Sequence, residues 1–104
     1  MMVDVLGTLY EIGESIPLNT TSADGVCRSY SKEILYRRAV DMLDADDPIS
    51  AKKRRQKEVI RHELIHAFFH EAGLGTYEMD EVLVEWLAKQ FPKLRTAIRQ
   101  AGGE

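Results

Sequence analysis

Two histidines and a glutamate in the second half of the chain form a motif whose side chains could bind a metal ion and catalyse a reaction. His62, Glu63 and His66 belong to the pentapeptide HELIH, in which the histidines are four residues apart. On an α-helix such side chains lie one turn above each other, so both imidazoles can bind one metal ion. Glu63 then lies beside the ion, where a carboxylate can take a proton from a water that the metal activates. The motif predicts a zinc site with Glu63 as its general base.

The surroundings of the pentapeptide argue against two histidines on a solvated helix face. Apolar side chains flank the motif on both sides, at Val59, Ile60, Leu64, Ile65, Ala67, Phe68 and Phe69. Gly73 and Gly75 follow and are typical of a helix end. The motif is therefore predicted to lie on a helix with a buried face, close to its C-terminal end.

A catalytic zinc ion usually takes three protein ligands and keeps one position for water or substrate. Several residues are candidates for the third ligand: His70, Glu71, Asp80, Glu81 and Glu85. His70 lies about 12 Å along the helix axis from His62, too far to share one ion on a straight helix. A third histidine in the metzincin register is absent. Glu81 and Glu85 share one face of the next predicted helix, and their spacing alone favours neither.

Two long helices are expected to position these residues. The first is predicted to run from Ser50, as N-cap, to about residue 72, with Pro48 at its boundary. The second is predicted to start at Thr76 and to run to about Phe91. Pro92 is expected to break it, so that residues 93–100 form a short last helix.

The first half of the chain is predicted to form strands. Residues 3–12 are rich in β-formers and predict one strand with a bend at Gly7. Residues 13–25 are polar and predict a loop, while residues 26–30 and 33–37 predict a β-hairpin with its turn at 31–32. Residues 40–48 are acidic and turn-like, with room for a helical turn. The expected fold is α+β, in which a small antiparallel sheet packs on the motif helix and a second, antiparallel helix.

Composition limits the functional classes. A chain of 104 residues predicts one domain, residues 1–104, and its 44% apolar content is ordinary for a globular protein. No apolar run is long enough for a membrane span and no export signal precedes the first strand, so we expect a cytoplasmic location. Cys27 alone cannot form an intramolecular disulfide and is expected to be a half-buried strand residue.

One basic run lies at the start of the motif helix. Residues 52–55, with Lys57 and Arg61, follow four aspartates at positions 41, 44, 46 and 47. Because the aspartates offset the basic charge, the run predicts a solvated, self-neutralising helix face. The net charge of −3 and the lack of interleaved aromatic residues give no reason to expect a nucleic-acid partner.

The motif and the segment after it resemble a family of metallopeptidases. An H-E-x-x-H helix followed by a glutamate-bearing helix is similar to the gluzincins. Residues 81–92, EVLVEWLAKQFP, resemble the E-x-x-A-N-x-F-A-x-x-L-x-P segment of the small ImmA/IrrE-like proteins, which are often phage- or mobile-element-associated. The resemblance covers roughly residues 56–92. It departs from the pattern at Val84, in place of Ala, and at Glu85, in place of Asn.

The resemblance implies a minimal zincin-like domain and a role for each acid. It implies that Glu81 is the third zinc ligand. Glu85 matches the acid that accepts the outer N–H of a ligand histidine in thermolysin-type sites, and it stays an alternative ligand. The expected activity is zinc-dependent peptide-bond hydrolysis on a protein or peptide substrate. Tyr30, Tyr36 and Tyr77 are candidates for the donor to the oxyanion.

The small size of the chain leaves room for a different function. A free strand edge in the 26–37 hairpin could hold an extended peptide by main-chain pairing, as a peptidase requires. Yet a chain of 104 residues has little surface for a deep specificity cleft. The alternative prediction is a non-catalytic, zinc-stabilised module that binds another protein and is phage- or mobile-element-encoded.

Overall fold

A computed structural model describes residues 1–20 and 22–104. Within these ranges the elements are β1 (Met2–Val5), β2 (Thr8–Glu14), a 3-10 turn (Pro17–Thr20), β3 (Gly25–Arg28), β4 (Glu33–Tyr36), a second 3-10 turn (Ala39–Asp41), α1 (Ile49–Glu71), α2 (Gly75–Glu78) and α3 (Glu81–Ala101). The class is α+β, as the sequence predicts. The 26–37 hairpin is confirmed as β3 and β4, and the helical turn expected within residues 40–48 begins at Ala39.

The sheet is mixed rather than antiparallel, which corrects the sequence prediction. Its strand order is β1-β2-β4-β3. The β1–β2 and β3–β4 pairs are antiparallel, but β2 and β4 run parallel, with Ile12 opposite Ile34. A parallel pair requires a crossover connection, and here residues 15–32 provide it. This pairing joins segments distant in sequence, so local patterns did not reveal it.

The single strand predicted over residues 3–12 is a hairpin. Leu6 and Gly7 have φ angles of 51° and 90°, which turn the chain back on itself in two residues. The Gly7 backbone N–H donates to Asp4 Oδ1 at 2.7 Å and closes the turn. A positive φ is unusual for leucine, which is why Gly7 alone suggested only a bend.

The predicted loop over residues 13–25 is shorter than expected. Gly13 and Glu14 complete β2, Pro17–Thr20 forms the 3-10 turn, and Gly25 opens β3. Position 21 of the predicted loop lies outside the described residues.

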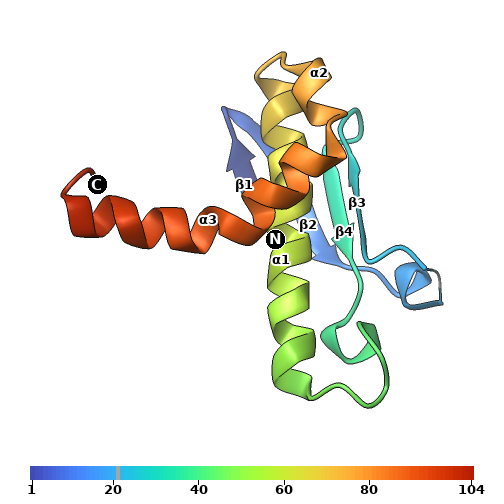
Figure 1. The fold of residues 1–104 in the computed structure, drawn as a ribbon. Helices are drawn as coiled ribbons and strands as arrows, with labels where there is room; N and C mark the ends of the chain where they lie inside the picture. The colour runs from blue at the N-terminus through green and yellow to red at the C-terminus, as the bar shows by residue number, and fades with distance from the viewer. Residues whose placement is uncertain (21) are drawn as a thin grey trace.

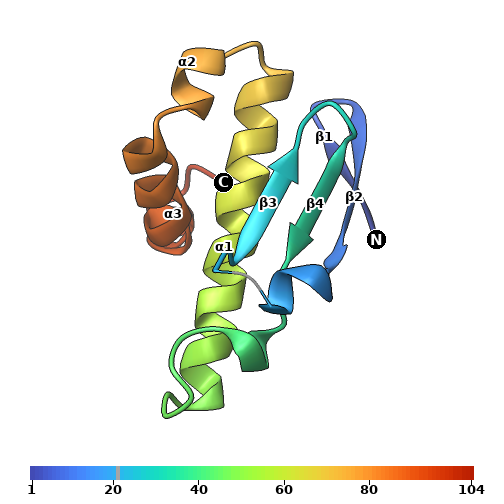
Figure 2. The same ribbon diagram turned by 90° about the vertical axis from the view of Figure 1, so that its right-hand side faces the viewer.

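One face of the sheet packs against α1. Tyr10 and Ile12 of β2 are buried, while Leu9 and Glu11 alternate with them and are exposed, which is the pattern of a sheet with one solvated face. The core joins these residues to Val5, Ile34 and Ala67. Figure 2 shows α1 between the sheet and α3. The motif helix is therefore held from two sides.

The long motif helix begins two residues earlier than predicted. Pro48, not Ser50, is the N-cap, and α1 runs from Ile49 to Glu71. At the other end Gly73 adopts a φ of 74°, and the Leu74 N–H donates to the Phe69 carbonyl at 2.8 Å. This geometry is a left-handed helix end of the kind that glycine favours, so the predicted stop is confirmed.

The second half of the helical region differs from the prediction. Thr76 lies within the short helix α2, and the cap of α3 is Asp80, whose carboxylate accepts the Leu83 N–H at 3.0 Å. Pro92 lies inside α3, which continues to Ala101 instead of breaking. Figure 1 shows α3 crossing α1 obliquely and then extending away from the rest of the molecule, rather than lying along α1 as an antiparallel partner. Among the described residues, no helix combines the length and apolar character that a membrane span requires.

Candidate metal centre

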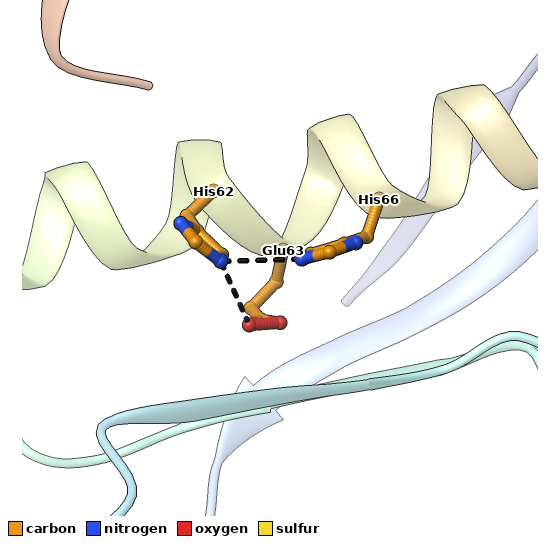
Figure 3. Close-up of side chains that lie close together, drawn as sticks. All are labelled: His62, Glu63 and His66. Atoms are coloured by element: carbon orange, nitrogen blue, oxygen red, sulfur yellow. Dashed lines mark hydrogen bonds and ion pairs between the residues drawn. The ribbon is translucent and has the colours of Figure 1, made fainter. Parts of the chain in front are cut away.

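The two histidines of the motif converge on one point. The Nε2 atoms of His62 and His66 are 3.2 Å apart, and both side chains are largely buried, with exposed fractions of 17% and 14%. Figure 3 shows both rings on one side of α1, with their Nε2 atoms facing each other. The one-turn spacing of the sequence thus becomes a pair of nitrogen donors with a common focus.

Glu63 lies beside this pair, on the side of the sheet. Its Oε1 is 4.0 Å from His62 Nε2, and the residue is only 7% exposed. Burial raises the pKa of Glu63 to about 7, and Glu81 and Glu85 add to the rise while His62 opposes it. A carboxyl group with a pKa near neutrality can both accept and return a proton.

Gly25 makes the close approach of β3 to Glu63 possible. A Cβ atom at this position would lie 2.6 Å from Val59 Cγ1 and 3.0 Å from Glu63 Cγ. Glycine therefore allows the start of the edge strand to lie directly against the general-base candidate. Nothing in the local sequence around Gly25 marks it apart from the other glycines.

Glu81 completes the group from a second helix. Its Oε2 is 3.1 Å from His62 Nε2 and its Oε1 is 2.9 Å from His66 Nε2. Glu81 is the first residue of α3, and its side chain is 65% exposed. Two imidazole nitrogens and a carboxylate thus meet at one position, open to solvent on the Glu81 side.

Glu85 contacts the opposite nitrogen of the same imidazole. His62 Nδ1 donates to Glu85 Oε2 at 2.7 Å. Burial favours the neutral acid, but hydrogen bonds with Glu58 and His62 outweigh it and lower the pKa of Glu85. For Glu58, burial and the hydrogen bond with Glu85 raise the pKa. A hydrogen bond to Nδ1 directs the free lone pair of His62 to Nε2, the atom that faces His66 and Glu81.

The other candidates for the third ligand are engaged elsewhere. Glu71 accepts from Lys32 at 3.0 Å and from Tyr10 at 3.2 Å. His70 lies between Glu71 and Glu78, 3.8 and 3.5 Å away. Asp80 caps α3. The structure therefore brings Glu81, and not these three residues, to the two Nε2 atoms.

We compared the chain with models of protein families, with curated proteins and with solved structures. Nothing matched. The resemblance to the gluzincins and the ImmA/IrrE-like proteins therefore stays a prediction from the motif and from residues 81–92.

The three tyrosines proposed as oxyanion donors contact other residues. Tyr77 packs on the Phe69 ring at 6.0 Å between centroids, and Tyr30 lies edge-on to His70 at 5.2 Å. Tyr36 packs against the core of the sheet. None of these contacts directs a phenol toward His62 or His66.

Cys27 is a half-buried residue of β3, as the sequence predicts. Its Sγ lies 3.7 Å from Ser29 Oγ. Burial raises the pKa of the thiol to about 11, which disfavours the thiolate that a nucleophile or zinc ligand requires.

The basic run at the start of α1 is more than a solvated face. Lys52 is buried and donates to the Val40 carbonyl at 3.3 Å. Arg55 pairs with Asp24 and Glu58, and Arg61 Nε donates to the Ala88 carbonyl at 2.6 Å. The prediction of a self-neutralising surface is therefore wrong for these three side chains. Apart from Glu58, their partners lie outside α1, so only the Arg55–Glu58 spacing of three residues gave a sequence signal.

An open cleft of about 420 Å³ runs beside the group. Residues of the edge strand β3 line one wall, and residues of the three helices and of the α2–α3 link line the rest: Gly25, Val26, Cys27, Glu63, His66, Glu78, Met79 and Glu81. In the part of the chain that the structure describes, β3 pairs with β4 alone, so its other edge is available for main-chain hydrogen bonds. The cleft thus joins a strand edge to His66, Glu63 and Glu81.

Proposed function

We propose that this protein is a zinc-dependent metallopeptidase in which His62, His66 and Glu81 bind the ion. The observation that carries the proposal is the spacing of 2.9 to 3.2 Å among their donor atoms. Ligand atoms on a tetrahedral zinc ion at ordinary bond lengths are about 3.3 Å apart. Two imidazoles and one carboxylate also form the donor set of a known class of catalytic zinc sites. The residues present therefore fit the ion.

The number of ligands favours catalysis over a purely structural ion. A structural zinc site usually has four protein ligands, whereas the three proposed here leave one position for water or substrate. Glu63 is buried beside the site without being one of the three. Bound zinc supplies Lewis acidity, which activates water and polarises the substrate carbonyl.

The residues of the chain have separate roles in this proposal. Glu63 accepts the proton of the attacking water and delivers it to the leaving amine. Glu85 holds the Nδ1–H of His62 and so fixes the ring orientation. The free edge of β3 binds the substrate as an added strand, which places its backbone along the wall of the cleft that holds Glu63. The substrate class is an extended peptide or an unfolded protein segment.

A second candidate function is a zinc-stabilised binding module without turnover. The observation in its favour is the second half of α3, where the apolar Phe91, Leu94 and Ile98 are 40% to 49% exposed. Exposed apolar groups at helical spacing are typical of surfaces that contact another protein.

Metal analysis combined with a peptide-cleavage assay distinguishes the two functions. We expect one zinc per chain, and cleavage of a proteome-derived peptide mixture that mass spectrometry detects. Glu63→Gln should keep the zinc and lose cleavage. A wild-type protein that purifies without zinc, and does not bind it when titrated, would contradict the metal centre. If both the wild type and Glu63→Gln bind zinc and their peptide-cleavage results are the same, the binding module is favoured.

A further inference from the structure

Three carboxylates from three parts of the chain surround the guanidinium of Arg55. Arg55 Nε and Nη2 each lie 3.2 Å from Asp24 Oδ2, in the segment just before β3. Nη1 lies 2.9 Å from Glu58 Oε1 on α1 and 3.6 Å from Glu85 Oε1 on α3. One side chain thus connects the entry to the edge strand, the motif helix and the helix that carries Glu81.

Glu85 uses its two oxygens in opposite directions. Oε2 accepts the hydrogen bond from His62 Nδ1 at 2.7 Å, while Oε1 faces Arg55 at 3.6 Å and Lys89 at 3.8 Å. A carboxylate held at one oxygen only can rotate or turn away. Contact at both oxygens restricts its orientation and thereby the orientation of the imidazole.

The neighbourhood of Glu85 contains a second acid, Glu58, that contacts the same guanidinium. Glu58 and Glu85 both lie next to Nη1 of Arg55, so two acidic groups share one cation behind His62. Arg55 contacts both, whereas Lys89 is an exposed side chain whose ion pair is with Glu85, at 3.8 Å.

Asp24 fixes the guanidinium in place. Because Nε and Nη2 of Arg55 both face one Asp24 oxygen, Nη1 stays directed at Glu58 and Glu85. The planar fork of arginine makes this three-way arrangement possible, and a lysine ammonium could not reproduce it. Arg37 also lies 3.6 Å from Asp24 and helps to hold it.

We infer that Arg55 is a positioning residue of the site, which holds Glu85 against His62 Nδ1 and so aims His62 Nε2 at the metal position. The inference rests on the proposed function for its zinc readout. The contacts from Arg55 through Glu85 to His62 are present in the protein without an ion. Arg55 does not touch the proposed ion or the substrate.

The test compares Arg55→Gln with Arg54→Gln. Arg54 is the exposed neighbour in the same basic run and is the matched control for the loss of one positive charge. Zinc affinity, measured by competition with a chromogenic chelator, should fall about 10-fold or more in Arg55→Gln, which is the range for residues that orient a ligand histidine. Arg54→Gln should bind zinc as the wild type does, and Arg55→Lys should lie between the two.

A second readout follows the His62 ring directly. A Nδ1–H held by a carboxylate at 2.7 Å should give a proton resonance that exchanges slowly with water, in metal-free and in zinc-loaded protein. His62→Gln identifies the signal by removing it. In Arg55→Gln the signal should weaken or disappear through faster exchange, whereas loss of an ordinary surface ion pair would leave it unchanged.

The two readouts separate failure of this inference from failure of the proposed function. If Arg55→Gln has the zinc affinity of the wild type and also its His62 Nδ1–H signal, the proposed role of Arg55 is overturned. If the wild type binds no zinc, the proposed function fails, and the Nδ1–H signal still decides whether Arg55 holds Glu85. If Arg55→Gln does not fold, Asp24→Asn tests the same contacts by removing the charge that holds Arg55. Zinc affinity and the Nδ1–H signal should then fall in the same direction but by less.

Discussion

At the scale of single residues, the site depends on the two ring nitrogens of one imidazole. His62 presents Nε2 to Glu81 and Nδ1 to Glu85, and both acids come from α3. The side chain of Glu81 is 65% exposed, whereas that of Glu85 is 31% exposed and contacts Arg55 as well. One acid is therefore free to close on an ion while the other is held. Their four-residue spacing predicted a common face, but only the direction of each ring nitrogen separates their roles.

The two acids should differ sharply on substitution. Glu81→Ala removes a direct ligand and should leave little bound zinc. Glu85→Ala removes the hydrogen bond to His62 Nδ1 but no direct ligand, and should weaken zinc binding by about 10- to 100-fold. Titration of both variants against a chelator of known affinity measures the difference. If Glu85→Ala loses zinc and Glu81→Ala keeps it, the two assignments are reversed.

Glu71 gives the stability of the protein a dependence on acidic pH. Hydrogen bonds, first of all from Lys32, lower the pKa of this carboxyl group. A group with a depressed pKa in the folded state contributes stability above its unfolded pKa of about 4.3, and this contribution is lost as the pH falls through the folded value. The thermal midpoint of the wild type should therefore drop more steeply from pH 6 to pH 3 than that of Glu71→Gln.

The control for this measurement is Glu104→Gln, at the exposed C-terminal end. Its midpoint should follow that of the wild type at every pH. Parallel pH profiles for the wild type and Glu71→Gln would show that the Lys32–Glu71 contact contributes nothing to stability.

At the scale of elements, the continuity of α3 through Pro92 has a local explanation. Proline has no N–H, so the carbonyl four residues earlier, that of Ala88, loses its helical hydrogen bond. Arg61 of α1 donates to this carbonyl at 2.6 Å instead. The sequence predicted a break because the rule for proline considers one helix alone. The compensating donor comes from another helix, 27 residues away in the sequence.

This compensation predicts coupling between Arg61 and Pro92. Arg61→Met in the metal-free protein should cost about 1 to 3 kcal/mol of unfolding free energy, because it leaves the carbonyl of the buried Ala88 without a donor. In a Pro92→Ala background the new backbone N–H can satisfy that carbonyl, so the same change should cost less. Urea denaturation of the two single variants and the double variant gives the coupling energy. Equal costs in both backgrounds would contradict the explanation.

At the scale of the whole molecule, the sequence predicted what local periodicity controls. The motif helix and the β3–β4 hairpin are confirmed, because apolar spacing and turn residues determine such elements locally. The parallel pairing of β2 with β4 and the contacts of Arg55 with Asp24 were not predicted. Both join segments far apart in the chain, and Asp24 lies in a region where the sequence indicated only a loop. The histidines and Glu63 could be predicted because one helix carries all three.

A metal ion at the proposed site would also connect two helices that meet only in part. His62 and His66 belong to α1 and Glu81 begins α3, whose second half extends away from the body of the protein (Figure 1). An ion that binds the folded state alone adds about 2.7 kcal/mol at a free concentration of 100 Kd. For a domain of this size, this raises the thermal midpoint by roughly 10 to 20 °C. Chelation should remove the gain, and magnesium should not restore it, because this ion prefers oxygen ligands.

His66→Ala is the decisive comparison, because it removes one of the two α1 ligands without changing the contact of Glu85 with His62. Its thermal midpoint should respond to neither zinc nor chelator. If zinc stabilises His66→Ala as much as the wild type, the ion binds elsewhere on the molecule. If zinc stabilises only the wild type, the rise in midpoint measures how strongly the ion holds α3 against α1.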